Sequence, residues 1–349
     1  MKKSIQALIM AAAMLAGPMV FTSCEEILGE WSRPAPNPVT PTPEPEPDPT
    51  LMLKTPLTLE AAVAGAKVTF KADDANVEKD IEYSTDGGAT WTSGNTGGSG
   101  VEVTLTNIGD KVMLRGDNSQ YGKDNEGTPD TYNTISCTAD CYVYGNIMSL
   151  IDKTGFATNK VLPTGTYTFY NLFKDNTYLK NHPNAAYTLE LPATTLKEYC
   201  YRSMFSGCKA LVTPPVLPAT KLENSCYSTM FRSCFSMVTP PALPATELKN
   251  NCYQSMFDNC TSLETTPRLP ATELKKGCYY SMFEGCTSLK EAWVKANVKV
   301  GAPDYECKDM FYGCTNASTS QFHTGDSKDN WTAAAAFPNL SQWQFSAYE

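Results

Sequence analysis

The chain has 349 residues, 28 basic against 37 acidic side chains, and a formal net charge of −9. It contains no run of five or more basic residues, which argues against nucleic acid as a partner and against direct binding to anionic lipid. The length that remains after an export signal and a tether suffices for two domains with separate hydrophobic cores.

Residues 1–23 have the features of a lipoprotein signal peptide. Lys2 and Lys3 precede a largely apolar stretch, residues 5–20, which is shorter than the ~20 residues that a transmembrane helix requires. The sequence Phe-Thr-Ser-Cys that follows is similar to a bacterial lipobox and makes Cys24 the predicted lipidation site. The alternative is an ordinary secreted protein that is cleaved nearby and leaves Cys24 free.

Residues 24–50 are predicted to form the lipidated N-terminus and a tether. Glu25 and Glu26 are similar to the acidic residues that direct lipoproteins to the outer face of the outer membrane. Proline occurs at almost every second position from 34 to 49, which favours an extended polyproline II segment about 50 Å long at ~3.1 Å per residue. We therefore predict a protein of the outer membrane that faces the cell exterior and contacts the membrane only through its lipid.

Residues 51–145 are predicted to form a small antiparallel β-sandwich. Short runs separated by turn signals alternate apolar with polar residues, as expected for strands that have one face on a core. These runs are residues 57–61, 67–72, 80–84, 101–106 and 111–115. Two packed sheets would bury such faces. Residues 146–190 are interpreted as the junction and N-terminal cap of the segment that follows.

Two short motifs lie in this first domain. Residues 84–91 fit the Asp-box pattern S-x-D-x-G-x-x-W, which predicts a hairpin turn in which Asp86 accepts turn amides and Trp91 packs beneath. Residues 115–117 are the integrin-type tripeptide Arg-Gly-Asp. We interpret both as local structure at strand ends and not as functional sites.

Residues 191–318 repeat with a period of 26. The tetrapeptide Leu-Pro-Ala-Thr begins at Leu191, Leu217, Leu243 and Leu269, and segments of the form Cys-Tyr-x-(Ser/Thr)-Met-Phe-x-x-Cys lie between the copies. A fixed period between 20 and 50 residues is typical of solenoids. Each repeat is predicted to hold a turn, a short helix with inward apolar side chains, and a short extended segment. Residues 319–349 are predicted to form the C-terminal cap.

The repeat cysteines are predicted to be buried free thiols that act as small apolar residues. On a continuous helix, Cys252 and Cys260 would lie about 12 Å apart, beyond the ~7 Å that a disulfide allows. No Cys-x-x-Cys sequence occurs, and we expect no metal site. Cys137 and Cys141 differ, because they are four residues apart in an irregular stretch and are able to pair.

The Cys-Tyr-x-Ser-Met-Phe-x-x-Cys-x-x-Leu units resemble BspA-like leucine-rich repeats. The lipobox, proline-rich tether, small β-domain and Gly-Asn-Ile-Met-Ser-Leu junction at 145–150 also resemble surface lipoproteins of gut and oral anaerobes that carry such repeats. The resemblance covers most of residues 20–318. It implies a β-rich multidomain chain whose β-sandwich is followed by a right-handed β/α leucine-rich-repeat solenoid, and a role in adhesion to host matrix or to other cells. No binding residue is carried over from the family.

Catalysis is not expected. The chain has only two histidines, His182 and His323, and no nucleophile, zinc-protease or phosphate-binding motif accompanies them. We therefore predict a non-catalytic protein without a cofactor.

Binding is expected at positions that vary on the regular frame. The predicted ligand-binding residues on the helical segment are Arg202, Gln254 and Tyr280. Those on the extended segment are Arg268, at the position equivalent to Val294, and Trp293, which stands where other repeats have proline. Trp293 is either an exposed anchor or part of the core.

The leading hypothesis is a surface lipoprotein whose repeats bind an extracellular macromolecule, such as a matrix protein or another cell surface. The alternatives are a glycan-binding lipoprotein for nutrient capture and an envelope scaffold protein.

Overall fold

The computed structural model describes residues 48, 50–119, 121, 132–298, 305–314, 320–333 and 343–349. The predictions for the signal peptide, for Cys24 and for nearly all of the tether lie outside the described residues. The described part is rich in β-structure, has few helical residues and forms several sheets, none of which closes into a barrel.

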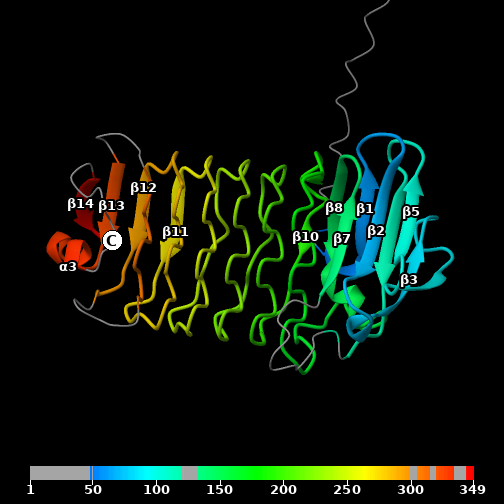
Figure 1. Ribbon diagram of the computed structural model, residues 1–349, viewed down its shortest axis with the longest axis horizontal. Coiled ribbons are helices and arrows are strands. Elements are labelled where there is room, and N and C mark those ends of the chain that lie inside the picture. Colours follow the sequence, from blue (N-terminus) through cyan, green and yellow to red (C-terminus); the bar gives the residue numbers. More distant parts are fainter. Residues whose placement is uncertain are drawn as a thin grey trace, which may run out of the picture. The chain divides into compact units, whose positions relative to one another are not determined.

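Two sheets form the N-terminal part (Figure 1). The elements in chain order are α2 (Leu51–Lys54), β1 (Leu57–Ala61), β2 (Ala66–Ala72), η1 (Ala75–Val77), β3 (Asp80–Ser84), β4 (Thr92–Asn95), β5 (Val101–Leu105), β6 (Lys111–Arg115), β7 (Asn133–Cys137), β8 (Cys141–Asn146) and η2 (Ile147–Leu150). All five predicted strands are present, at the predicted positions to within one residue. β4, β7 and β8 are additional strands.

The larger sheet has the order β10-β8-β1-β6-β3-β4, with β9 also paired to β8, and the smaller has the order β5-β2-β7. Pairs within residues 57–146 are antiparallel, whereas β9 (Leu179–Asn181) and β10 (Leu189–Glu190) run parallel to β8. In β2, buried and more exposed residues alternate along the whole strand. That alternation places its apolar side chains between the sheets.

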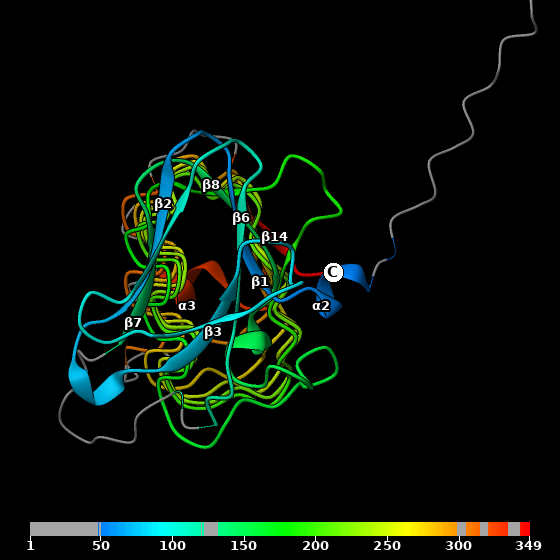
Figure 2. The same cartoon turned by 90° about the vertical axis from the view of Figure 1, so that its right-hand side faces the viewer.

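Each sheet continues into the repeats along its own side. We call residues equivalent to 199–208 in each repeat the turn segment, and residues equivalent to 211–217 the extended segment. The first turn segment joins the smaller sheet, because the amide of Ile135 in β7 donates to the carbonyl of Leu172 at 2.6 Å. The larger sheet continues through β9 and β10. Figure 2, which looks along the stack, shows β2 and β7 on one side and β1, β6 and β14 on the other.

The turn segments are not helices, so the prediction of short helices was wrong. Residues with positive φ recur at every fourth position, for example Asn251 (55°), Ser255 (50°) and Asn259 (60°). A right-handed helix cannot pass through such residues. Asparagine, glycine and serine occupy most of these positions, and the first two are the residues that adopt this conformation most readily.

Backbone hydrogen bonds alternate between two directions in the turn segments. The amide of Tyr201 donates to the carbonyl of Cys226 in the next repeat at 2.9 Å, whereas the amide of Arg202 donates to Tyr199 in its own repeat at 3.1 Å. The same alternation continues through Met204 and Phe205. Half of the amides therefore join neighbouring repeats, as in a sheet, and the other half close local turns.

After β10, the extended segments become strands only toward the C-terminal end. These strands are β11 (Thr265–Leu269), β12 (Glu291–Val294), β13 (Ser320–Thr324) and β14 (Trp343–Ala347), and the helix α3 (Lys328–Ala333) lies between the last two in the sequence. The strands pair in parallel in the order β11-β12-β13-β14. Residues 211–217 and 237–243 carry paired prolines and form no strand, because proline has no amide to donate to a ladder. The short strands expected from the repeat are thus absent from these two segments, whereas β12 has four residues and β11, which contains Pro267, has five.

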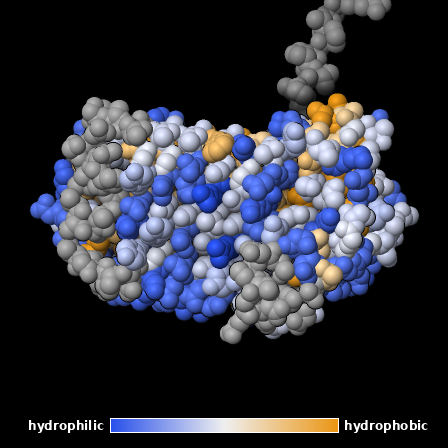
Figure 3. Space-filling view, viewed as in Figure 1, coloured by the Kyte–Doolittle hydropathy of each residue, from blue (hydrophilic) through white to orange (hydrophobic). Residues whose placement is uncertain are grey.

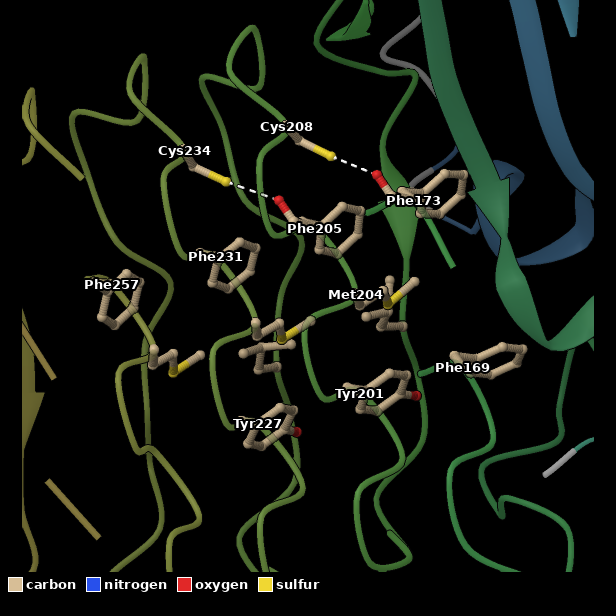
Figure 4. Close-up of a cluster of buried hydrophobic side chains, with 14 of the residues drawn as sticks. Phe169, Phe173, Tyr201, Met204, Phe205, Cys208, Tyr227, Phe231, Cys234 and Phe257 are labelled. Carbon is tan, nitrogen blue, oxygen red and sulfur yellow. Dashed lines mark hydrogen bonds between the residues drawn. The ribbon is translucent and has the colours of Figure 1, made fainter. Parts of the chain in front are cut away.

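Ladders of identical side chains fill the stack (Figure 4). Phe231 lies between Phe205 and Phe257, with ring centroids 5.5 and 5.8 Å apart and nearly parallel planes. Tyr227 and Tyr253 stack in the same way at 6.0 Å. These rings are at most 1 % exposed, so the sequence repeat places each residue type against its own copy in the next repeat.

Cysteines form two further ladders, and the twelve in the described part are free and buried. This agrees with the prediction for the repeats, although its helical argument does not apply. One ladder also has a polar role. The thiol of Cys208 donates to the carbonyl of Phe173 at 3.0 Å, and Cys234 donates to Phe205 at 3.2 Å (Figure 4). The thiol therefore satisfies a carbonyl of the preceding repeat as well as filling space.

Two tyrosines of the stack bury an unpaired hydroxyl. In the described structure the Oη atoms of Tyr201 and Tyr253 have no hydrogen-bond partner, and the hydroxyl of the neighbouring Tyr227 is not among such atoms. An unsatisfied buried hydroxyl costs about 1–3 kcal/mol. We expect Tyr253→Phe to raise the free energy of unfolding by about 1 kcal/mol in urea denaturation. Tyr227→Phe is the matched control, and a loss of stability in Tyr253→Phe would contradict the orphan hydroxyl.

Candidate functional site

The five predicted binding residues lie at three separate places. Arg202 is near the start of the repeats, Gln254 and Tyr280 lie together on the turn segments, and Arg268 and Trp293 lie together on β11 and β12. Turn segments and extended segments occupy opposite sides of the stack (Figure 2). The five residues therefore do not converge on one site.

Gln254 and Tyr280 line a depression of about 250 Å³, which we call the turn-face pocket. Its other lining residues come from three successive turn segments and are Asn251, Lys276, Gly277, Tyr305 and Lys308. Sequence reasoning found Gln254 and Tyr280 because their positions vary between repeats. It missed Tyr305 and Lys308, because a two-residue insertion shifts the last repeat out of the simple period of 26.

The polar groups of the turn-face pocket are largely uncommitted. Within the described residues, the side chains of Gln254, Lys276 and Tyr280 make no hydrogen bond or ion pair to the protein. Lys308 lies with its ammonium 5.0 Å from the ring centroid of Tyr305 and 3.9 Å from a carboxylate oxygen of Asp309. No acidic side chain lines the depression. The pocket thus offers amides, phenols and at least one uncompensated cation.

Arg202 lies in a group of tyrosines. Its guanidinium is 5.9 Å from the ring centroid of Tyr170 and 5.7 Å from that of Tyr199, and Tyr167 stacks on Tyr199 at 4.5 Å. Its Nε atom is buried without a partner in the described structure. Burial is also the main cause that raises the pKa of Tyr167. This arginine is held mainly by aromatic contacts, which leaves its charge without a partner in the described part.

Arg268 and Trp293 are direct neighbours. The prediction that aligned Arg268 with Val294 was therefore wrong. A bulge in β11 shifts the register, so that Arg268 pairs with Trp293 and not with Val294. The Arg268 guanidinium lies 3.9 Å from the Trp293 ring centroid, and His323 of β13 stacks on the other side at 3.6 Å. Both faces of the indole are covered, so Trp293 joins the strands and offers no open aromatic platform.

His182 belongs to a cluster that the sequence did not reveal. Its ring contacts those of Tyr142, Tyr144 and Tyr187 at centroid distances of 5.1, 5.7 and 4.5 Å. The hydroxyl of Tyr144 donates to Glu60 at 2.7 Å, and burial together with this carboxylate raises the pKa of Tyr144. The insertion that carries His182 was visible in the sequence, but its partners on β1 and β8 were not. The loop also borders a cavity of about 400 Å³.

The two short motifs of the first domain have structural partners. Asp86 accepts the amide of Thr90 at 2.9 Å, as predicted for the turn, and hydrogen bonds from Thr90 and Ser84 hold the pKa of Asp86 well below its usual range. Arg115 of the Arg-Gly-Asp tripeptide pairs with Glu82 at 2.7 Å and covers the Trp91 ring at 3.7 Å. Arg115 is therefore committed to internal contacts.

Across the described ranges, no group of three or more His, Cys, Asp or Glu side chains is arranged to hold a metal ion. The same residues contain no helix with the length and apolar character needed to cross a bilayer. Comparison of the chain with models of known families, with curated proteins and with solved structures finds no match. The resemblance to BspA-like repeats thus depends on the residues of the chain itself.

Proposed function

We propose that this protein is a non-catalytic, lipid-anchored protein of the outer cell surface that binds an extracellular macromolecule through its repeats. In this proposal the repeats form a right-handed leucine-rich-repeat solenoid of the BspA-like kind, in which turn segments take the place of helices, and the N-terminal sheets form a β-sandwich that links it to the tether. The lipid on Cys24 supplies the anchor, and the proline-rich segment supplies reach.

One observation carries the proposal. Inward residues of the turn segments repeat almost unchanged, whereas the position after the tyrosine ladder varies: Arg202, Gln254, Tyr280 and Lys308 are partly exposed there, and Ser228 is buried. The core residues are thus kept while one surface position changes from repeat to repeat. Repeat proteins use such extended surfaces to bind large partners. The mostly hydrophilic surface over the stacked repeats in Figure 3 agrees with exposure to water, and apolar residues gather mainly toward the end that carries β1 and β2.

A glycan-binding role is the second candidate, and the turn-face pocket favours it. Two tyrosines and two amides surround a shallow depression. This arrangement fits a sugar ligand better than it fits a protein partner with a flat surface. An adhesin and a glycan receptor differ in their ligand and not in their anchor.

The test uses cells that display the full chain. We expect them to adhere to immobilised fibronectin or fibrinogen and expect the triple variant Arg202→Ala, Gln254→Ala, Tyr280→Ala to lose adhesion by about tenfold. The matched control replaces exposed residues on the opposite side, Val212→Ala and Val216→Ala.

Cys24→Ala should move the protein from the membrane fraction to the medium. Equal adhesion by the triple variant would refute binding through this column, and membrane retention of Cys24→Ala would refute the anchor.

A further inference from the structure

We propose that the turn-face pocket binds a single acidic sugar unit, a pyranose ring that carries a carboxylate or a sulfate. This inference rests on the proposed surface-binding function and specifies what one part of that surface recognises.

The size of the pocket limits what it holds. Its volume of about 250 Å³ is below the roughly 300–1,000 Å³ of pockets that enclose drug-sized ligands. It is lined by side chains from three turn segments, which form a shallow depression and not a channel. One ring at a chain end or a side branch fits this space, whereas a longer segment would extend over the neighbouring repeats.

Two tyrosines provide the apolar part of the site. Tyr280 is half-buried, and Tyr305 is 58 % exposed. A phenol presents a flat apolar face and a polar edge, and the C–H faces of a pyranose pack on such rings. Tyr280 stands where the other repeats from residue 191 onward have arginine, serine, glutamine and lysine, so the frame does not require an aromatic residue there.

Two amides provide hydrogen bonds for sugar hydroxyls. Asn251 and Gln254 each offer one acceptor and two donors, which match a hydroxyl that both donates and accepts. Gly277 has φ +59°, and a Cβ at this position would collide with Oδ1 of Asn251. Glycine thus leaves room for the Asn251 side chain, which lines the depression.

The charges favour an acidic sugar over a neutral one. Lys276 is exposed and has no acidic partner among the described residues, while the charge of Lys308 is partly balanced by Asp309 at 3.9 Å. The chain as a whole has a net charge of −9, whereas this depression is lined by two lysines and by no acidic residue. A carboxylate or sulfate beside Lys276 gains a modest attraction that salt weakens.

The equivalent places in the preceding repeats lack this set of residues. One repeat earlier, Ser225 and Ser228 replace Asn251 and Gln254, and Asn250 replaces Lys276. The stack forms there with the same hydrogen bonds and ring contacts. Packing of the repeats therefore does not explain why tyrosines, amides and lysines converge at this one point.

The test measures binding of four sugars to the purified full chain in mild detergent by titration calorimetry. The probes are sialyllactose and a hyaluronan tetrasaccharide for the carboxylate, a heparin-derived tetrasaccharide for the sulfate, and lactose as the neutral reference. We expect at least one acidic probe to bind at least tenfold more tightly than lactose, and 0.5 M salt to weaken that binding. Tyr280→Ala and Lys276→Glu should each weaken it by tenfold or more.

Matched controls are available close to the pocket residues in the sequence. Tyr312 is 53 % exposed outside the pocket, and Lys275 lines a different depression next to Glu273 at 4.0 Å. Tyr312→Ala and Lys275→Glu should leave binding unchanged, and unchanged circular dichroism in all variants shows that the fold is intact. Absence of binding to every acidic probe, equal binding of lactose, or insensitivity to Tyr280→Ala and Lys276→Glu would each overturn the inference. The adhesion assay on cells stands apart from these results, so surface binding can hold when sugar recognition fails.

Discussion

Raising the pH from 8 to about 10.5 should unfold the protein even in the absence of denaturant. Ten cysteines in the turn segments are buried free thiols: Cys200, Cys208, Cys226, Cys234, Cys252, Cys260, Cys278, Cys286, Cys307 and Cys314. Burial raises the pKa of Cys200 and Cys252 from the ordinary 9.0 to about 12. Burial also raises the pKa of the other eight. Four stacked tyrosines, Tyr201, Tyr227, Tyr253 and Tyr279, have their pKa raised in the same way.

The sign of the effect follows from proton linkage. Between pH 9 and about 12 the unfolded chain loses thiol protons that the folded chain keeps, so the unfolded state binds fewer protons and the free energy of unfolding falls as pH rises. Each such group contributes about 1.4 kcal/mol per pH unit in this window. Ten groups together remove on the order of 10 kcal/mol per pH unit, which matches the ~5–15 kcal/mol total stability of typical domains.

Urea titrations from pH 7 to 10.5 with a non-thiol reductant measure this effect through circular dichroism. Cys252→Ala is the matched variant, because it removes one ionisable thiol from the stack. Its free energy of unfolding should fall less steeply above pH 9, by about 1.4 kcal/mol per pH unit. A urea midpoint that stays constant between pH 8 and 10.5 would show that the thiols are not buried in the protonated form.

The strands of the N-terminal part were predictable because their signals are local. Val68 and Phe70 alternate with polar residues in β2, and Val101, Val103 and Leu105 alternate in β5. Period-two alternation leaves few other conformations. The inward residues of the repeats were also predictable, since a position that keeps its residue type in every copy faces the shared core.

The turn segments were mispredicted because two patterns coincide there. Apolar residues such as Leu248, Cys252, Met256 and Cys260 recur every four positions, which is typical of a helix face. The same spacing arises in a series of tight turns in which every fourth residue has a positive φ. Asn251, Asn259 and their glycine equivalents Gly277 and Gly285 carried the distinguishing signal, because asparagine and glycine adopt the left-handed conformation most readily. The column of Ser255 gave no such signal, since its equivalent Thr229 is β-branched and adopts the same conformation.

The candidate sites were predictable as single residues and not as groups. Gln254 and Tyr280 differ from their equivalents, and that variation was visible. Their contact with Tyr305 depends on an insertion whose effect on register was not. Likewise, the bulge in β11 that brings Trp293 to Arg268 is a backbone irregularity with no distinct sequence pattern here.

Phe231→Ala should cost about 4 kcal/mol of stability, because a fully buried phenylalanine truncated to alanine typically costs 3–5 kcal/mol. Phe231 is 0 % exposed and stacks on Phe205 and Phe257. The substitution therefore leaves a cavity and removes both ring contacts. In a stack where each repeat contacts only its neighbours, the loss weakens two interfaces and divides the array at this point.

Phe235→Ala is the matched control for this prediction. The residue lies four positions later in the same repeat, is 37 % exposed, and contacts Lys209 with its ammonium 5.6 Å from the ring centroid. Its truncation should cost no more than about 1 kcal/mol, the value of an exposed cation–π contact. Urea unfolding and hydrogen exchange compare the two variants. If the stack is continuous, Phe231→Ala increases amide exchange in the turn segments on both sides, whereas similar costs for the two variants would mean that the phenylalanine ladder does not hold the repeats together.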